Sequence, residues 1–255
     1  MSTTAIGDIH GNMRALDDLL ARLAPELGGD DTVVFLGDYI DRGPDSKRCI
    51  ERILDFRRTC KARVVALLGN HEQWLLQTCH DHTRHSWILG LEAFPTIRSY
   101  SPNAAAQLVE AIGNLGARVV LDHVRLPYDL FFDAVPPEHM AFLSSLATFL
   151  RTPEAVCVHG GLDPAGGSVE EQEADRLIWG ADGFPEGYQG RDRIVYGHAD
   201  NPVLDALGWP HPRITGRTYG LDTIGQGVLT AVRLPGEAVF QSARYLDERV
   251  VRGSS

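Results

Sequence analysis

The stretch that decides the fold is residues 32–43, which read TVVFLGDYIDRG. Residues 32–36 are apolar and rich in β-branched side chains, and this pattern predicts a short buried strand. The polar loop that follows places Asp38, Asp41 and Arg42 immediately after that strand. In open parallel sheets, ligands bind at the carboxyl ends of the strands. We therefore expect these three side chains to belong to a functional site at one edge of a sheet.

The same arrangement of strand and polar loop occurs once before and once after this segment. Residues 3–7 predict a strand that ends in DIHGN at 8–12, and residues 63–68 predict one that ends in GNHE at 69–72. Asp8 and Asp38 are 30 residues apart, and Asn70 lies 32 residues further on. Because one strand–helix–strand unit takes about 30 residues, the spacing predicts parallel strands joined by right-handed helical crossovers.

Further elements follow from the same kinds of pattern. Leucines at helical spacing come after the first loop, and a second helix is expected after Pro44. The strand pattern resumes at residues 155–158 and 193–196, and His159 and His198 follow these strands beside glycines. The last strands are predicted as a hairpin of residues 218–233 and 238–245, with Gly225 and Gly227 near the turn.

Residues 78–150 interrupt this alternation of strands and helices. They are rich in His, Pro and Ala, with helices predicted near 103–115 and 137–149. We interpret residues 78–150 as a mostly helical insertion within a single domain that spans residues 1–255.

Composition bounds the class of protein. Apolar residues make up 44% of the chain and charged residues 23%, as is usual for globular proteins. The net charge of −10 argues against a nucleic-acid duplex or a membrane surface as the main partner, but allows a phosphoprotein or a small phosphorylated substrate at a locally positive site. The sequence shows no signal-peptide pattern and no CxxC pair. We expect a cytoplasmic monomer with free thiols.

Six side chains with oxygen or nitrogen donors stand at the ends of the predicted strands: Asp8, His10, Asp38, Asn70, His159 and His198. Because the set contains no thiolate, it suits Mn, Fe or Zn in an open catalytic site better than a closed structural zinc site. Six ligands are too many for one catalytic metal with open positions, but they suffice for two metals that share a carboxylate. Two metals about 3.5–4 Å apart can clamp a phosphoryl group and hold a hydroxide between them.

Each motif alone also has an ordinary structural interpretation. An Asp-x-His pair is common in surface loops, Asn70 suits a helix cap, and His198 fits a hydrogen-bonded core histidine. The joint occurrence of the motifs, in order and at strand–helix–strand intervals, favours a shared metal site.

Together the five motifs resemble the signature of the phosphoprotein-phosphatase family of calcineurin-like metallophosphoesterases. The resemblance covers residues 5–72 and 155–233, includes Leu221-Asp222-Thr223, and is most specific at residues 37–43. It implies an α/β fold in which two mixed sheets form a β-sandwich flanked by helices. It also implies two groups of metal ligands that share a bridging Asp38: Asp8, His10 and Asp38 for one metal, and Asp38, Asn70, His159 and His198 for the other.

The same resemblance implies roles for residues beside the metals. His71 would protonate the leaving oxygen and Asp41 would orient His71, which suits an imidazole near neutral pH. Arg42 would grip the phosphate, because a planar guanidinium can bind two oxygens at once. Asn70 and His71 are also expected to contact the substrate.

One segment departs from the family pattern. Bacterial members often carry a second phosphate-binding arginine directly after Leu-Leu-Trp or Leu-Ile-Trp, whereas here residues 177–179, LIW, are followed by GAD. Arg176, Arg191 and Arg193 remain as candidates for that second cation.

Three functions are compatible with these residues. The leading hypothesis is a protein serine/threonine phosphatase that contains two divalent metals, with manganese expected. The alternative is a diadenosine-tetraphosphate hydrolase, which would use the same metals to cleave an anhydride. The second alternative is a metal-binding regulatory module with weak catalysis.

Overall fold

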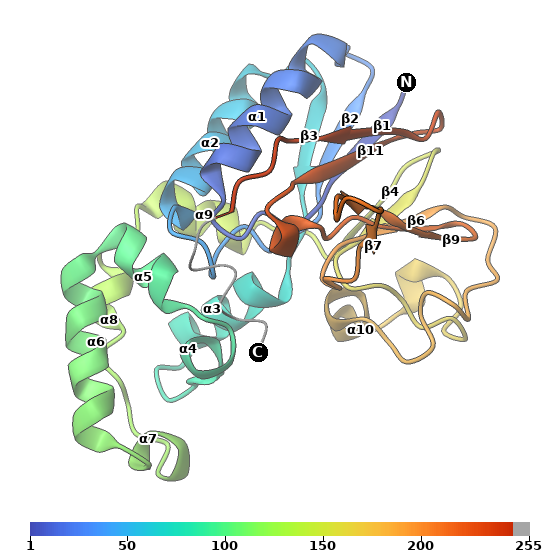
Figure 1. Cartoon of the computed structure of the whole chain (residues 1–255). Helices are drawn as coiled ribbons and strands as arrows, with labels where there is room; N and C mark the ends of the chain where they lie inside the picture. The colour runs from blue at the N-terminus through green and yellow to red at the C-terminus, as the bar shows by residue number, and fades with distance from the viewer. Residues whose placement is uncertain (247–255) are drawn as a thin grey trace.

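The computed structural model describes residues 1–246, which form two stacked β-sheets with helices on their outer faces (Figure 1). The first sheet contains β1 (Thr3–Ile6), β2 (Thr32–Phe35), β3 (Arg63–Ala66), β11 (Thr230–Leu234) and β12 (Ala238–Gln241). Its strand order is β12-β11-β1-β2-β3. The strands β1, β2 and β3 run parallel, whereas β11 is antiparallel to both of its neighbours.

The second sheet contains β4 (Phe149–Arg151), β5 (Val156–Val158), β6 (Ile194–Tyr196), β9 (Arg213–Thr215) and β10 (Thr218–Gly220), in the order β4-β5-β6-β10-β9. Its three central strands run parallel and its two edge strands run antiparallel. A separate two-stranded ribbon consists of β7 (Val203–Leu204) and β8 (Pro210–His211). Both main sheets are mixed, so the predicted fold class is confirmed.

The apolar residues of β2 serve two cores because neighbouring side chains point to opposite faces of the sheet. Val33 and Phe35 belong to a buried cluster with the helices α1 (Met13–Leu23) and α2 (Ser46–Thr59), which cover the outer face. Val34 belongs to the cluster between the sheets, together with Cys157 and Val195 of the second sheet. Each such side chain contributes about 1.5–3 kcal/mol when it is fully buried. This double burial explains why the strand reads as a continuous apolar run.

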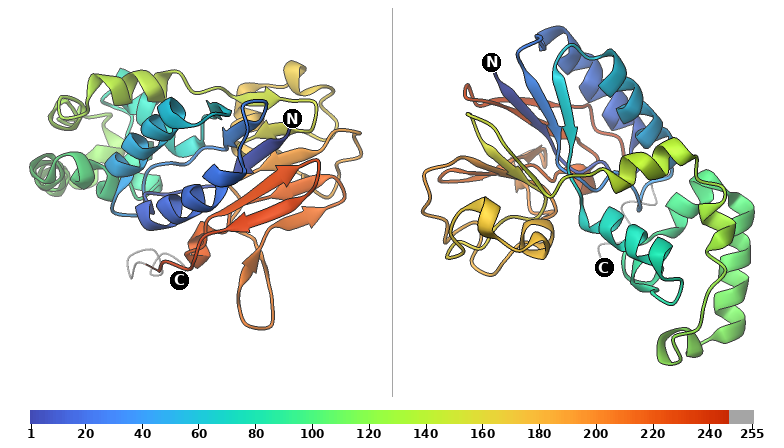
Figure 2. Two further views of the ribbon diagram at one scale, coloured as in Figure 1. Left: turned by 90° about the horizontal axis from the view of Figure 1, so that it is seen from above. Right: turned by 180° about the vertical axis from the view of Figure 1, so that it is seen from behind.

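The second sheet has an outer layer of its own. The short helix α10 (Ala174–Trp179) contributes Leu177 to a buried cluster with strand residues Val158 and Tyr196. Figure 2 shows the resulting order of layers, with α1 and α2 on one side and α10 on the other. The loops after β1, β2, β5 and β6, and the helix α3 (Asn70–His80) shortly after β3, therefore meet at one edge of the sandwich.

Helices form most of the segment predicted as an insertion, and they extend away from the sheets (Figure 1). They are α4 (Ser86–Gly90), α5 (Phe94–Tyr100), α6 (Pro102–Leu115), α7 (Arg118–Leu121), α8 (Asp129–Phe132) and α9 (Pro137–Ser144). Two predicted boundaries were wrong. The helix expected at 137–149 ends at Ser144, and Phe149 already pairs with Val158 in the second sheet. The first residues, 78–80, belong to α3.

The prediction of a hairpin from residues 218–233 and 238–245 was also wrong in its pairing. β10 belongs to the second sheet, whereas β11 belongs to the first, so the chain crosses between sheets through a short 3₁₀ helix, Ile224–Gln226. Gly225 and Gly227 therefore lie at this crossing. The true hairpin joins β11 and β12, in register from Thr230 opposite Gln241.

All four cysteines are free, with Cys49 and Cys157 buried. Within residues 1–246, no helix combines the length and the apolar character needed to cross a bilayer.

Candidate metal centre

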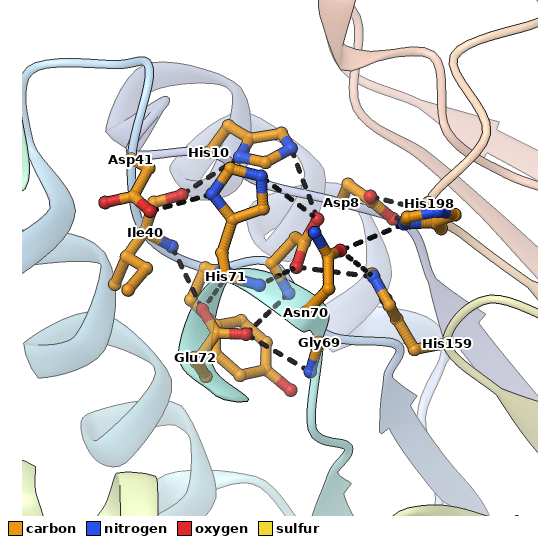
Figure 3. A network of polar contacts seen from close by, with 12 residues as sticks. Asp8, His10, Ile40, Asp41, Gly69, Asn70, His71, Glu72, His159 and His198 are labelled. Atoms are coloured by element: carbon orange, nitrogen blue, oxygen red, sulfur yellow. Dashed lines mark hydrogen bonds and ion pairs between the residues drawn. The ribbon is translucent and has the colours of Figure 1, made fainter. Parts of the chain in front are cut away.

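All six predicted ligands come together at the shared edge of the two sheets (Figure 3). The site draws on both sheets, since Asp8, Asp38 and Asn70 follow strands of the first sheet and His159 and His198 follow strands of the second. Asp8, His10, Asp38, Asn70 and His159 are all at most 3% exposed. Polar side chains buried this deeply need partners, and several of them face one another.

Asp38 lies between two groups of potential ligands. On one side its Oδ2 atom is 3.5 Å from His10 Nε2 and 3.8 Å from His71 Nε2. On the other side its Oδ1 atom is 3.3 Å from His159 Nε2. The two oxygens of one carboxylate therefore face opposite groups, as a bridging ligand requires.

The amide oxygen of Asn70 completes the second group. Asn70 Oδ1 lies 3.0 Å from His159 Nε2 and 2.9 Å from His198 Nδ1. Within residues 1–246, ligand atoms of Asp38, His159 and His198 lie within 4.8 Å of one another, as do those of His10, Asp38 and His71. The geometry thus places His71 only slightly farther from Asp38 than His10 is, although the sequence predicted His71 as a proton donor.

Asp8 reaches the cluster from β1 and is fixed by the opposite sheet. The backbone N–H of His198 donates to both Asp8 oxygens, at 3.2 and 3.0 Å. A Cβ at Gly197 would overlap with Asp8 Oδ1, so glycine is required for this approach. Asp222, for which the sequence predicted no role, is only 2% exposed. Neither of its carboxylate oxygens has a hydrogen-bond partner within the described residues.

The loops hold the ligands in an unusual backbone conformation. His10, Asp38, Asp41, Arg42 and His198 all have positive φ, between 45° and 69°. Non-glycine residues rarely adopt this left-handed region, and when they do they often lie at functional sites. The concentration of such residues in the predicted motifs is independent support for a functional site.

Glu72 fixes the loop that contains Asp38. It lies in the GNHE motif, but the sequence predicted no role for it. Its carboxylate accepts hydrogen bonds from the backbone N–H groups of Asp38 at 2.9 Å, Tyr39 at 2.8 Å, Ile40 at 3.3 Å and Gly69 at 3.2 Å. Burial and the charge of Asp38 raise the pKa of Glu72 to about 7. One buried side chain therefore ties the loop after β2 to the start of α3.

His71 is oriented by a dedicated network. Its Nδ1 atom lies 2.7 Å from Asp41 Oδ2, and Trp87 Nε1 donates to that same oxygen at 2.8 Å. Thr96 donates to the other Asp41 oxygen at 2.6 Å. The predicted contact between Asp41 and His71 is therefore present, and it leaves His71 Nε2 facing the cluster with no hydrogen-bond partner in residues 1–246. Trp87 and Thr96 come from the helical segment, and no sequence signal pointed to them.

The charge states of the imidazoles differ because their surroundings differ. Burial lowers the pKa of His198 to about 4 and holds the pKa of His10 well below its ordinary value. Both are therefore neutral near pH 7, the form that binds metals. Burial opposes the protonation of His71, but Asp38 and Asp41 overcome it and raise the pKa of His71 to about 9. A protonated His71 fits an acid rather than a ligand.

These residues fit a pair of divalent metals. His10 Nδ1 lies 2.9 Å from Ile40 O and His159 Nδ1 lies 3.0 Å from Leu36 O, so backbone carbonyls fix both rings with Nε2 directed at Asp38. Such second hydrogen bonds are typical of metal-ligating histidines. His10 Nε2 has no hydrogen-bond partner among residues 1–246. Burial, with Asp222 and Asp38 nearby, raises the pKa of Asp8 well above its usual range.

The candidate phosphate-binding arginines lie in different parts of the structure. Arg42 is half-buried, and its positive charge opposes the rise that burial causes in the pKa of Asp8 and adds to the lowering of the pKa of His10, so it lies beside the cluster. Arg176 lines a cavity together with His198. Arg191 and Arg193 line a different cavity with Ala155, at the opposite end of β5 from His159. Strand direction therefore carries Arg191 and Arg193 away from the ligands, and Arg176 is the candidate that lies beside His198.

Several curated relatives of this chain are named as polyphosphatases or as bis(5'-nucleosyl)-tetraphosphatases. The chain is 27% identical, over 92% of its length and 89% of the relative's, to the asymmetrical bis(5'-nucleosyl)-tetraphosphatase PrpE of Oceanobacillus iheyensis. It is 29% identical over 43% of its length to the zinc-dependent endopolyphosphatase of Saccharomyces cerevisiae. The chain spans only 34% of the length of that enzyme. It spans 25% of the length of a symmetrical bis(5'-nucleosyl)-tetraphosphatase.

Solved structures share the fold. A crystal structure assigned provisionally as a diadenosine tetraphosphatase has a TM-score of 0.59 and 20% identity, over 96% of this chain and 95% of that chain. A family model described as calcineurin-like phosphoesterase matches residues 1–227, which include all six predicted ligands. The chain therefore belongs to the calcineurin-like phosphoesterase family.

Proposed function

We propose that this chain is a metal-dependent hydrolase that cleaves a phosphoanhydride bond in dinucleoside polyphosphates. The observation that carries this proposal is the similarity to an asymmetrical bis(5'-nucleosyl)-tetraphosphatase, which extends over 92% of this chain and 89% of that protein. Symmetrical bis(5'-nucleosyl)-tetraphosphatases also match, over shorter segments. This pattern favours the dinucleotide over a phosphoprotein, which the sequence had ranked first.

Two divalent ions would occupy the cluster in this proposal, manganese or zinc. Asp8, His10 and Asp38 would hold one ion, and the other would be held by Asp38, Asn70, His159 and His198. When bound, the ions would neutralise phosphate charge and lower the pKa of a water molecule.

The chain's own residues would then act on the leaving group and the phosphate. The backbone N–H of Arg42 donates to Glu92 O at 3.4 Å, whereas its guanidinium has no hydrogen bond or ion pair with other described residues and is available to bind phosphate oxygens. Asp41 accepts from His71 Nδ1–H, and because the pKa of His71 is raised to about 9, the ring also carries a proton at Nε2 near pH 7. Hydrolysis forms one bond from water oxygen to phosphorus and breaks the anhydride bond, and the departing oxygen accepts the proton from His71. Solvent returns that proton.

A phosphoserine or phosphothreonine protein remains the second candidate substrate, because one observation favours it. An alkoxide leaving group requires protonation far more than a phosphate leaving group does. His71 Nδ1 lies 2.7 Å from Asp41 Oδ2, and this pair can donate a proton to such a leaving group. The presence of this proton donor therefore supports hydrolysis of a phosphomonoester as the second candidate reaction.

The test compares substrates on one preparation. Protein supplied with Mn²⁺ or Zn²⁺ would be assayed on diadenosine tetraphosphate and on a phosphothreonine peptide, with Asp38→Asn as the metal-site control. We expect kcat/KM for the dinucleotide to exceed that for the peptide at least tenfold, and Asp38→Asn to lose metal and activity together. Higher turnover of the peptide would reverse the order, and no turnover of either would favour a regulatory module.

A further inference from the structure

A groove beside His198 is bounded by an aromatic side chain and has a floor of small residues. Its volume is ≈ 280 Å³, and it is lined by Trp179, Phe184, Gly160, Gly180, Ala181 and Ala199 together with His198. We infer that this groove, the Trp179 groove, binds a purine base of the substrate by stacking against Trp179. The inference rests on the proposed function, since it assigns a place to one nucleoside of the dinucleotide.

Trp179 is held rigidly in position. Its Nε1 atom donates to Gln73 Oε1 at 2.7 Å. Its ring centroid lies 4.8 Å from that of Trp74 and 6.0 Å from that of His198. Gln73 and Trp74 belong to α3, the helix that begins with Asn70, so the same helix positions both the aromatic ring and a predicted ligand. A ring that is half-buried and already ordered loses little entropy when a ligand stacks on it.

The floor of the groove is formed where the backbones of two glycines pack closely together. Gly160 N donates to Leu177 O at 2.7 Å, and a Cβ at Gly160 would overlap with Ile178 O. Gly180 has φ of +79°, which a side chain rarely tolerates. Trp179 and the two glycines line the same cavity, so we place the planar base between them.

Position and charge favour a nucleotide over a peptide. A base against Trp179 would place its phosphates towards His198, which lines the same groove and belongs to the ligand cluster. Arg176 and Asp182 stand on the rim; the guanidinium suits phosphate and the carboxylate suits a ribose hydroxyl. The volume is just below the roughly 300–1,000 Å³ of typical small-molecule pockets, so the groove fits one compact planar group rather than an extended chain.

The experiment removes the stacking surface and keeps the chemistry. Trp179→Leu would be compared with Trp179→Phe and with Trp209→Leu, a tryptophan bonded to Gln241 on the first sheet. Each variant would be assayed on diadenosine tetraphosphate and on inorganic tripolyphosphate, which has the anhydride but no base. We expect Trp179→Leu to lower kcat/KM for the dinucleotide tenfold to a hundredfold more than for tripolyphosphate, roughly the effect of one lost base–aromatic stack. Trp179→Phe should retain most of the wild-type kcat/KM for the dinucleotide. Trp209→Leu should not lower kcat/KM for the dinucleotide more than for tripolyphosphate.

An equal fall on both substrates, or no fall on the dinucleotide, would overturn the inference. Binding of AMP, measured by calorimetry, separates this inference from the proposed function. If the wild type cleaves tripolyphosphate but not the dinucleotide, the proposed function fails, and AMP binding still decides the groove. We expect AMP to bind the wild type and Trp209→Leu alike, and Trp179→Leu at least tenfold more weakly. Equal AMP affinity in all three proteins, or no AMP binding by the wild type, would refute the groove.

Discussion

The carboxylate of Glu72 accepts a hydrogen bond of 2.9 Å from the backbone N–H of Asp38, so a buried acid without a predicted role holds the residue at the middle of the site. Asp38 has φ of 52°, a conformation that needs support from its surroundings. A Cβ at Gly69 would overlap with Asp38 and Glu72, so the two loops meet through glycine.

Glu72→Gln should destabilise the protein and weaken metal binding. Glutamine replaces one oxygen with an NH₂ group that cannot accept from the surrounding N–H groups, which leaves buried donors unsatisfied at about 1–3 kcal/mol. Calorimetric unfolding and metal analysis would measure both effects. The matched control is Glu138→Gln, because the Glu138 side chain is 63% exposed. Equal stability and metal content in the two variants would contradict a supporting role for Glu72.

His71→Asn should retain bound metal and slow turnover, most strongly for poor leaving groups. The acid role rests on the proton that Asp38 and Asp41 stabilise, and general acid catalysis typically contributes 10²–10⁴-fold. Rates on an alkyl phosphate and on an activated aryl phosphate, measured alongside metal content, would test this. The two rates should fall unequally; an equal fall would rule out proton donation, and loss of metal would make His71 a ligand.

Arg176→Met should lower kcat/KM for phosphorylated substrates roughly tenfold to a hundredfold, because one charge-assisted hydrogen bond is worth about 1.5–3 kcal/mol. The same change at Arg191 should have no such effect, since Arg191 lies with Ala155 at the other end of the second sheet. Steady-state kinetics of both variants at one ionic strength would compare them. If the Arg191 variant were the slower enzyme, the assignment of the second cation would have to be reversed.

Asp31→Asn should remove part of the acid sensitivity of folding. Asp31 accepts from Gly28 N at 2.8 Å and Ser2 Oγ at 2.8 Å and pairs with Arg233 at 3.0 Å. These partners hold the pKa of Asp31 below its ordinary value of 3.8. Because the folded pKa is depressed, the stabilisation is present above pH 3.8 and is lost as the pH falls through the lower, folded value.

Denaturant unfolding between pH 3 and pH 7 would measure this difference. The wild type should be more stable than Asp31→Asn at pH 7, by about 1–3 kcal/mol. The two curves should approach each other in acid. Parallel curves across the whole range would show that Asp31 does not titrate differently on folding.

The sequence alone was sufficient for the parallel strands and for the six residues that gather around Asp38. Apolar runs such as residues 32–36, each followed by a polar loop at strand–helix–strand intervals, can satisfy burial only as central strands with their loops at one edge. Local pattern therefore carried this information.

Only the tertiary structure decided which sheet each later strand joins and which side chains support the site. β10 joins the second sheet and β11 joins the first, and this separation depends on burial between the sheets. Asp41 binds Trp87 and Thr96 across 46 and 55 residues. Trp179 meets Gln73 across 106 residues. No periodicity encodes such pairs, because they form only when distant segments pack together.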